Sequence, residues 1–333
     1  MLPELTVSRG FTSWTLDPAA LVAVVVLAGL YAYGVAGRVR SGQRLPVVRA
    51  ASFVVLGLGT IVVATMSSLA VYDRVLFWPA AVQNILLDLL APLGLALGDP
   101  LALAAPDGRL RRAMTSRPVR LLTFPLVSSL FVLISELAIY FTPYFPTALH
   151  NDLVRQLMHA QLLVTGSLFV LPMLTGQELL PRWCTHPIRA ALVFVDGLFD
   201  SIPGIVVMTS GTLVAGPWYR AHPRGWGPTL QFDQMLGGGL MLTLAEIVAL
   251  PFLIAVFFQW WHTERDRTAE LDARLDAELT PVGPAAPVGA ATTGTRVPAA
   301  SDAAPADTAD SGLVRPWWET DDGEVGQRMR RSR

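Results

Sequence analysis

The stretch PAALVAVVVLAGLYAYGVAG, Pro18–Gly37, contains 20 residues and no charged side chain. A helix needs about 20 mostly apolar residues to cross the hydrocarbon core of a bilayer. Lipid offers no hydrogen-bonding partners, so the backbone N–H and C=O groups of such a segment must bond to one another. An α-helix makes all these hydrogen bonds within the segment. The stretch therefore predicts a membrane-spanning helix.

Six further stretches of comparable length and apolar character follow along the 333-residue chain. With the first they predict an all-α, polytopic membrane protein whose transmembrane domain, residues 18–262, is a bundle of seven helices. Residues 1–17 precede this domain, without the apolar region and cleavage site of a secretory signal peptide. The six further predicted spans are Pro46–Tyr72, Val75–Gly98, Leu121–Phe141, Asp152–Leu174, Pro187–Val214 and Gln231–Trp261.

The composition supports this class and excludes several others. Hydrophobic residues make up 52% of the chain and charged residues 15%, with a mean hydropathy of +0.47, whereas a soluble domain carries about 25% charged residues. All 25 basic residues are arginine, which excludes a lysine Schiff base and therefore a retinal protein. The single cysteine, Cys184, excludes an intramolecular disulfide and a cysteine-rich zinc site. The sequence lacks the dense basic stripe that would indicate nucleic-acid binding.

The arginines of the loops predict the orientation in the membrane. Eleven arginines follow the first, third and fifth predicted spans, against three in the alternate loops. Positively charged loops stay in the cytoplasm, so this predicts an extracytoplasmic N-terminus and a cytoplasmic C-terminus. The eleven are Arg38, Arg40, Arg44, Arg49, Arg109, Arg111, Arg112, Arg117, Arg120, Arg182 and Arg189, and the three are Arg74, Arg220 and Arg224.

Residues 263–333 form a predicted cytoplasmic extension. The charged stretch His262–Leu279 predicts a helical stalk that continues the last span. It is followed by PVGPAAPVGAATTGTRVPAASDAAPADTAD, which is rich in alanine, proline, glycine and threonine. Such a composition cannot bury enough apolar surface to offset the loss of chain entropy on folding, so it predicts a disordered tail.

Ionisable residues inside the predicted spans are expensive in lipid, and each is a candidate for a functional site. Structural explanations stand beside the functional one. Asp152 and Arg155 are three residues apart and can form an ordinary ion pair at a helix start, and Glu136 and Glu246 can serve as hydrogen-bonded pins across the bundle. The ionisable residues within the spans are Asp88, Glu136, Arg155, His159, Asp196, Asp200, Asp233 and Glu246.

Four methionines and two histidines gather at one predicted depth. Near the outer ends of their spans lie Met66, Met158, Met208 and Met235, with His159 level with them and His150 just above in the external loop. Thioethers and imidazoles are the donors that suit Cu(I), so the pattern predicts a copper-handling site open to the outside. Methionine also fills gaps in apolar bundles, and that explanation remains open.

Three segments of the chain resemble the CtaG-like cytochrome c oxidase assembly factors, which are seven-span membrane proteins. They are LFWPAAVQNILLDLLAPLGLALGDPLAL from Leu76, RQLMHAQLLVTGSLFVLPML from Arg155 and FDQMLGGGLML from Phe232. The resemblance covers about Met66 to His262, and the Asp-Gln-x-x-Gly-Gly element is its most specific part. Positions that match the family are His150, His159, Asp233, Gln234, Gly237, Gly238 and Met241.

One departure from the family pattern concerns the third predicted span. Family members commonly carry His-Met pairs there, where this chain has Ala80, Ala81, Asn84 and Ile85. Asp88 remains in that span but is a harder donor. Either methionines elsewhere compensate, or the chain is a divergent member that keeps the scaffold with a lost or changed metal role.

The resemblance implies a membrane assembly factor, not an enzyme, that helps to deliver copper to the catalytic subunit of a haem-copper oxidase from the outer face. A copper chaperone is a further expected partner. In this hypothesis His159 binds Cu(I) transiently with Met158 and Met235, His150 is an entry ligand, and Asp233 orients the donors or draws the cation inward. The full set of candidate metal ligands is His159, His150, Met158, Met235, Asp233, Met66, Met208 and Asp88.

The main alternative is a proton-coupled transporter of a small solute. Gly or Pro interruptions and buried carboxylates mark such proteins, and Asp88, Asp196 and Asp200 could relay protons. No matching halves indicate an inverted repeat, which weighs against it. A bis-histidine haem carrier fails because only His159 lies well inside a predicted span and two axial ligands are needed.

Overall fold

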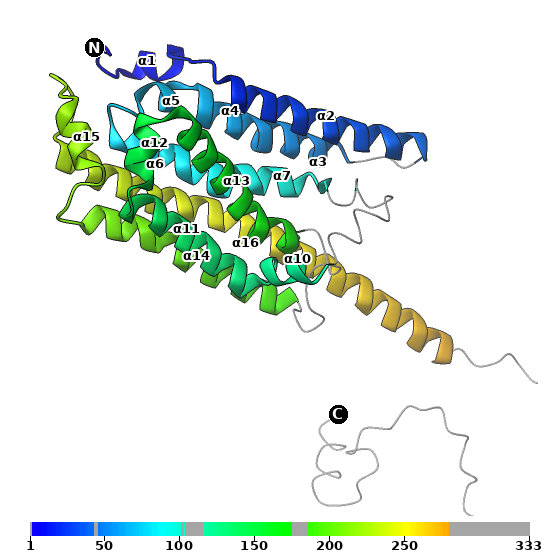
Figure 1. Cartoon of the computed structure of the whole chain (residues 1–333). Helices are drawn as coiled ribbons and strands as arrows, with labels where there is room; N and C mark the ends of the chain where they lie inside the picture. Colours follow the sequence, from blue (N-terminus) through cyan, green and yellow to red (C-terminus); the bar gives the residue numbers. More distant parts are fainter. Residues whose placement is uncertain (1, 43–45, 101–102, 104–115, 175–185, 280–333) are drawn as a thin grey trace, which may run out of the picture. The chain divides into compact units, whose positions relative to one another are not determined.

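The chain folds into α-helices, as the computed structural model in Figure 1 shows. The structure describes residues 2–42, 46–100, 103, 116–174 and 186–279, and there is no β-strand in those ranges. Within these described ranges, six helices are long and apolar enough to cross a membrane, or seven if one bent pair of helices counts as a single span. The prediction of an all-α, polytopic membrane protein is confirmed.

The helices follow one another in the order of the predicted spans. Up to residue 100 they are α1 Val7–Thr12, α2 Pro18–Arg40, α3 Val47–Ala51, α4 Gly59–Met66, α5 Ser68–Tyr72, α6 Phe77–Ile85 and α7 Ala91–Leu97, with π-helical segments at Ser52–Leu58 and Leu86–Leu90. After residue 115 they are α10 Arg117–Leu122, α11 Pro125–Phe141, α12 Tyr144–His150, α13 Asp152–Leu174, α14 His186–Thr209, α15 Gly216–Ala221 and α16 Leu230–Leu279.

The fourth predicted span, Leu121–Phe141, differs most from the structure. Its N-terminal residues belong to the short helix α10, and α11 begins only at Pro125. Proline disfavours a helical residue before it and is well suited to the first turn of a new helix. At the other end the chain bends by 62° between α11 and α12, so the candidate span is broken and not straight.

Two compact units make up the chain, Met1–His262 and Thr263–Arg333. In the second unit the charged residues are helical up to Leu279, as the last part of α16. The stretch predicted to be disordered begins beyond this point and lies outside the described residues, as does Cys184.

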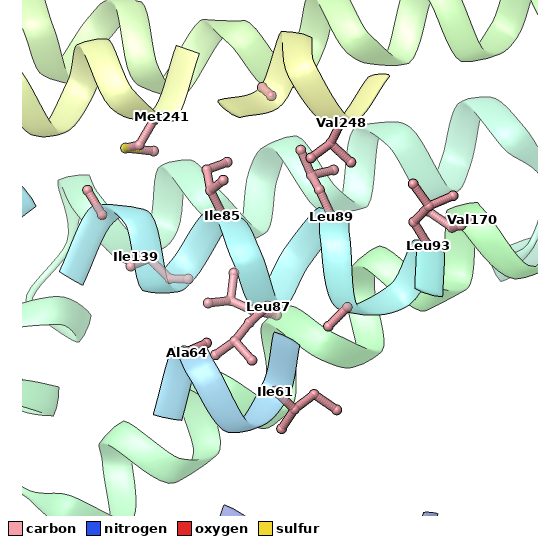
Figure 2. Close-up of a cluster of buried hydrophobic side chains, with 14 of the residues drawn as sticks. Ile61, Ala64, Ile85, Leu87, Leu89, Leu93, Ile139, Val170, Met241 and Val248 are labelled. Carbon is pink, nitrogen blue, oxygen red and sulfur yellow. The ribbon is translucent and has the colours of Figure 1, made fainter. Parts of the chain in front are cut away.

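The third span, α6 to α7 with its π-helical segment, is the centre of the first unit. Of its most apolar part 78% is buried, against 11% for α2. Figure 2 shows Ile85 and Leu89 pointing from this span toward α16, and Leu87 pointing the other way, toward Ala64 of α4. Side chains from opposite directions therefore pack on the third span, while most residues of α2 are not buried within the unit.

Residues before α2 lie against one end of the first unit. The Tyr72 hydroxyl donates a hydrogen bond to the carbonyl oxygen of Pro3 at 3.1 Å, and the Ser68 hydroxyl donates to that of Gly10 at 2.8 Å. The indole of Trp226 donates to the carbonyl of Leu2 at 3.1 Å. The N-terminal segment is thus hydrogen-bonded to residues that precede the third and the seventh span.

Candidate functional site

His159 is a buried histidine in the second turn of α13. Its side chain is 6% exposed, and its Nδ1 atom has no hydrogen-bond partner among the described residues. The charged groups that act on it are Arg155 and Asp17. The preceding residue, Met158, is 3% exposed. Two consecutive residues of α13 therefore bury a thioether and an imidazole, and the Nδ1 atom of that imidazole has no hydrogen-bond partner among the described residues.

The start of α2 is connected to the helix that carries His159. Asp17 accepts hydrogen bonds from the backbone N–H groups of Ala19 and Ala20, which caps α2. The same carboxylate accepts a hydrogen bond from the side-chain amide of Gln156 on α13. Two residues earlier, the Thr15 N–H donates to the carbonyl oxygen of Met66 at 2.8 Å. The entry of α2 thus contacts both α13 and the end of α4.

His150 is exposed, as its predicted position in a loop between spans suggested, but it is not isolated. Its ring lies 4.5 Å from the Trp218 ring, centroid to centroid, and His222 lies 4.1 Å from the same indole. Sequence spacing could not indicate this pairing, because His150 ends α12 and His222 follows α15. The structure therefore adds His222 to the residues around the predicted entry ligand.

Asp233 lies in the first turn of α16 and is 1% exposed. Its Oδ2 atom accepts hydrogen bonds from the Phe77 N–H at 3.0 Å and from the Arg224 guanidinium at 3.1 Å. Its Oδ1 atom accepts from the Trp78 N–H at 3.1 Å. No side chain next to α6 in sequence caps that helix, so Asp233 caps it from another span. Three donors occupy both oxygens of the carboxylate.

The rest of the Asp-Gln-x-x-Gly-Gly element also joins helices. The Gln234 side chain accepts from the Val214 N–H at 2.7 Å and donates to the carbonyl of Val207 at 3.2 Å, which fixes the end of α14. A Cβ atom on Gly237 would come within 2.6 Å of the Phe77 ring, and one on Gly238 within 2.6 Å of a backbone nitrogen of α14. The element therefore holds α6, α14 and α16 in close contact.

Two ion pairs define one end of the first unit, which we call the ion-pair end. They are Arg155–Asp73, with closest atoms 3.0 Å apart, and Arg224–Asp233, with closest atoms 3.1 Å apart. Arg155 also contacts Asp152 at 3.4 Å, which confirms the pair expected at the start of α13. Burial raises the pKa of Asp73 above its ordinary value, although the neighbouring Arg155 lowers it. The hydroxyl of Tyr219 donates to the Asp73 carbonyl oxygen at 3.1 Å.

The predicted metal ligands occupy different environments. Met235 is 45% exposed, on the surface of the unit, whereas Met66 is 6% exposed. Met208 is partly buried, and its sulfur would lie 3.7 Å from a Cβ atom on Gly239. Among the described residues no group of three or more histidine, cysteine or acidic side chains could hold a metal ion. The eight candidates therefore differ in burial, and copper binding stays a prediction.

Asp88 sits in the π-helical segment of the third span, away from the ion-pair end. It is 1% exposed, and its Oδ1 atom accepts a hydrogen bond from the Thr165 hydroxyl at 3.1 Å. A Cβ atom on Gly166 would lie 1.7 Å from the Asp88 carbonyl oxygen, so glycine is what allows the third and fifth spans to approach here. π-Helical segments inside α-helices occur frequently at functional sites.

Comparison with known proteins gives a consistent result. The family model for the "Cytochrome c oxidase caa3 assembly factor (Caa3_CtaG)" matches residues 29–263. The chain is 29% identical over 286 residues to the uncharacterized protein Mb0105 of Mycobacterium bovis and, equally, to the uncharacterized protein MT0111 of Mycobacterium tuberculosis. Each alignment covers 82% of this chain and 43% of the relative.

A third relative, the uncharacterized protein ML1998 of Mycobacterium leprae, is 25% identical over 282 residues, which cover 81% of this chain and 42% of that protein. The chain therefore spans about two fifths of the length of the curated relatives it matches. No solved structure matches the chain.

Proposed function

Because the chain belongs to the cytochrome c oxidase caa3 assembly factor family, we propose that it helps to assemble a haem-copper cytochrome c oxidase in the membrane. The observation that carries the proposal is the extent of the match, residues 29–263, which reaches from the middle of α2 to the end of the apolar part of α16. The role is that of a non-catalytic helper, and its partner is the catalytic subunit of the oxidase.

We further propose that the protein passes Cu(I) to this partner, as cargo and not as a resident cofactor. His159 and Met158 supply the central donors, an imidazole nitrogen and a thioether of the kind that Cu(I) prefers. The buried Nδ1 atom of His159, which lacks a hydrogen-bond partner among the described residues, supports this role. A few donors suit a carrier, because delivery requires release.

His150 is the proposed entry ligand, and its exposed ring lies edge-on to the Trp218 ring, which His222 also contacts. In this proposal the ion-pair end faces the extracytoplasmic side of a bacterial plasma membrane, as the arginine distribution predicts. Copper would reach His150 there from a copper chaperone. Asp233 has a smaller part than the sequence pattern suggested, because its oxygens already accept three hydrogen bonds.

Gene deletion and complementation in the host test the assembly role. We expect deletion to lower oxidase activity and the copper content of the oxidase at limiting copper, with recovery at excess copper. Wild type should complement, His159→Ala should not, and His262→Ala, which changes an exposed histidine, should complement fully. Unchanged oxidase activity after deletion would refute the assembly role.

Copper binding by the purified protein, in competition with a Cu(I) chelator, tests the finer proposal separately. We expect wild type and His262→Ala to compete for Cu(I) and His159→Ala to compete poorly. If deletion impairs the oxidase while wild type and His159→Ala bind copper equally weakly, the assembly role stands and copper transfer through His159 is wrong.

A further inference from the structure

Four carboxyl side chains lie buried near the middle of the spans, and we call them the carboxyl cluster. Their side chains are between 1% and 6% exposed, and they come from the third span, α11 and α14. Asp88, Asp196 and Asp200 each lie nine or more residues from either end of their helical spans, and Glu136 lies five residues before the end of α11. The members of the carboxyl cluster are Asp88, Glu136, Asp196 and Asp200.

The charged groups that act on the carboxyl cluster are other acids. Glu136 interacts electrostatically with Asp88 and Asp196. Asp200 interacts with the other three members and with Glu246 on α16. Among the described residues none of these electrostatic neighbours is a cation. Several ionised carboxylates at such spacing in a low-dielectric interior would repel one another strongly, so the cluster must be neutralised in another way.

Unpartnered oxygen atoms indicate what the cluster lacks. Asp88 Oδ2 and Glu136 Oε2 are buried and have no hydrogen-bond partner among the described residues. The same holds for Asn84 Oδ1, whose amide nitrogen donates to the Tyr140 hydroxyl at 3.0 Å. Tyr140 in turn interacts electrostatically with Glu136 and Asp88. Buried acceptors without donors cost free energy, and a proton on a neighbouring carboxyl group would supply the missing donor.

The spacing of the carboxyl groups favours protons over a metal ion. A hard cation such as Ca²⁺ needs several oxygen ligands converging on one point, and the described residues contain no group of three acidic or histidine side chains close enough to do this. Hydroxyl groups instead engage single carboxylates. Ser129 donates to Asp196, Thr165 to Asp88 at 3.1 Å, and Ser201 to Glu246 at 3.0 Å.

A cavity of about 20 Å³ adjoins the cluster, with Asp196 and Asp200 as its acidic lining residues. Its apolar lining includes Leu89, Leu93 and Val248, which Figure 2 shows around the third span and α16. A cavity of this size can hold one water molecule, provided that polar groups line it. Such a water molecule can accept a proton from one carboxyl group and donate one to the next.

Glu246 gives the cluster a contact with the surface of the unit. Its side chain is exposed, although it lies near the middle of the apolar part of α16, and Asp200 is its electrostatic neighbour. We propose that three members of the carboxyl cluster, Glu136, Asp196 and Asp200, form a proton-binding relay inside the membrane, which exchanges protons through water and reaches the surface at Glu246. In each step one carboxyl O–H bond breaks and one forms, through the intervening water. The relay is independent of the copper proposal.

Infrared spectroscopy of the purified full-length protein in lipid nanodiscs tests the relay without oxidase or copper. We expect the carbonyl stretch of protonated carboxyl groups to persist at neutral pH and to shift in D₂O. Glu136→Gln and Asp196→Asn should each remove part of its intensity. Glu264→Gln, which changes a half-exposed side chain on the charged part of α16, is the control and should leave the band unchanged.

Several results would overturn the relay. A spectrum with no protonated-carboxyl band at neutral pH would do so, as would a band that neither substitution in the cluster changes. A band that does not shift in D₂O would mean that the acids cannot exchange protons. Conversion of the band to carboxylate on addition of Na⁺ or Ca²⁺ would identify a metal-cation site instead. Circular dichroism of each variant separates these outcomes from a loss of helical structure.

Discussion

The Asp233 carboxylate on α16 accepts a hydrogen bond from the backbone N–H of Phe77, 156 residues earlier in the chain, at a distance of 3.0 Å. Phe77 is the first residue of α6, whose flanking residues provide no side-chain cap. The first N–H groups of a helix have no hydrogen-bond partner within it. Lipid offers them none either, so another part of the protein must supply the acceptor. The most specific element of the family resemblance therefore begins with an inter-helix cap.

Asp233→Asn tests this capping role. The substitution removes the charge that pairs with Arg224, whose side chain is only 7% exposed. Breaking a buried ion pair on one side costs about 3–5 kcal/mol, and we expect a loss of that size in the free energy of unfolding, measured by SDS titration in micelles. Asp152→Asn, at a carboxylate that is 72% exposed, should cost about 0–1 kcal/mol. Equal effects of the two substitutions would contradict the capping role.

The close approach of Gly166 to Asp88 predicts a second, larger effect. A methyl group on residue 166 would lie 1.7 Å from a backbone oxygen, which cannot rotate away. Overpacking costs about 1–3 kcal/mol where side chains can move, so we expect Gly166→Ala to exceed this range or to abolish accumulation of folded protein. Gly29→Ala, at a glycine with nothing within 4 Å of the added atom, is the matched control. Equal thermal stability of both variants would show that the third and fifth spans are not packed as described.

Hydropathy was sufficient to predict most of the fold. The predicted fifth span, Asp152–Leu174, agrees with α13 at both ends, because a long apolar run determines where a membrane helix lies. The break between α11 and α12 and the π-helical segment around Asp88 were not predicted. Both are local changes of backbone geometry inside apolar sequence, and a window average of hydropathy does not respond to them.

The side-chain contacts between helices were harder to predict. Helical spacing correctly suggested the Arg155–Asp152 pair on α13. It could not show that Arg155 also binds Asp73 on another segment, at 3.0 Å. Spacing along one helix carries information about that helix alone. Partners in other spans depend on how helices rotate against each other, which one sequence does not reveal.

Tyr219, which donates a hydrogen bond to Asp73 at the ion-pair end, should make the free energy of unfolding depend on pH in the alkaline range. Burial raises the pKa of the Tyr219 hydroxyl well above its ordinary value of 10.0, and the charge of Asp73 adds to this. Below about pH 10 both the folded and the unfolded state keep this proton, so stability does not change. Above that pH the unfolded state loses the proton first, and stability should fall by up to about 1.4 kcal/mol per pH unit.

Thermal unfolding in micelles between pH 8 and pH 11 measures this dependence. Tyr219→Phe should make the alkaline decline less steep, while losing about 1 kcal/mol at neutral pH through the missing hydrogen bond to Asp73. Tyr33→Phe, at a tyrosine that is 78% exposed on α2, should leave the decline unchanged. If Tyr219→Phe declines as steeply as wild type, Tyr219 is not the group responsible.

The different exposure of two methionines leads to a last prediction, for Cu(I) transfer. Met158 is 3% exposed and precedes His159, whereas Met235 is 45% exposed on another helix. Leucine nearly conserves methionine volume, so either substitution should cost less than about 1.5 kcal/mol in stability. We expect Met158→Leu to weaken Cu(I) binding about 10–100-fold, since loss of even an outer-shell partner costs that much, and Met235→Leu to weaken it little. The measurement is competition with a Cu(I) chelator. The reverse order would mean that the metal binds at the surface of α16, and His159 would then lose its central place.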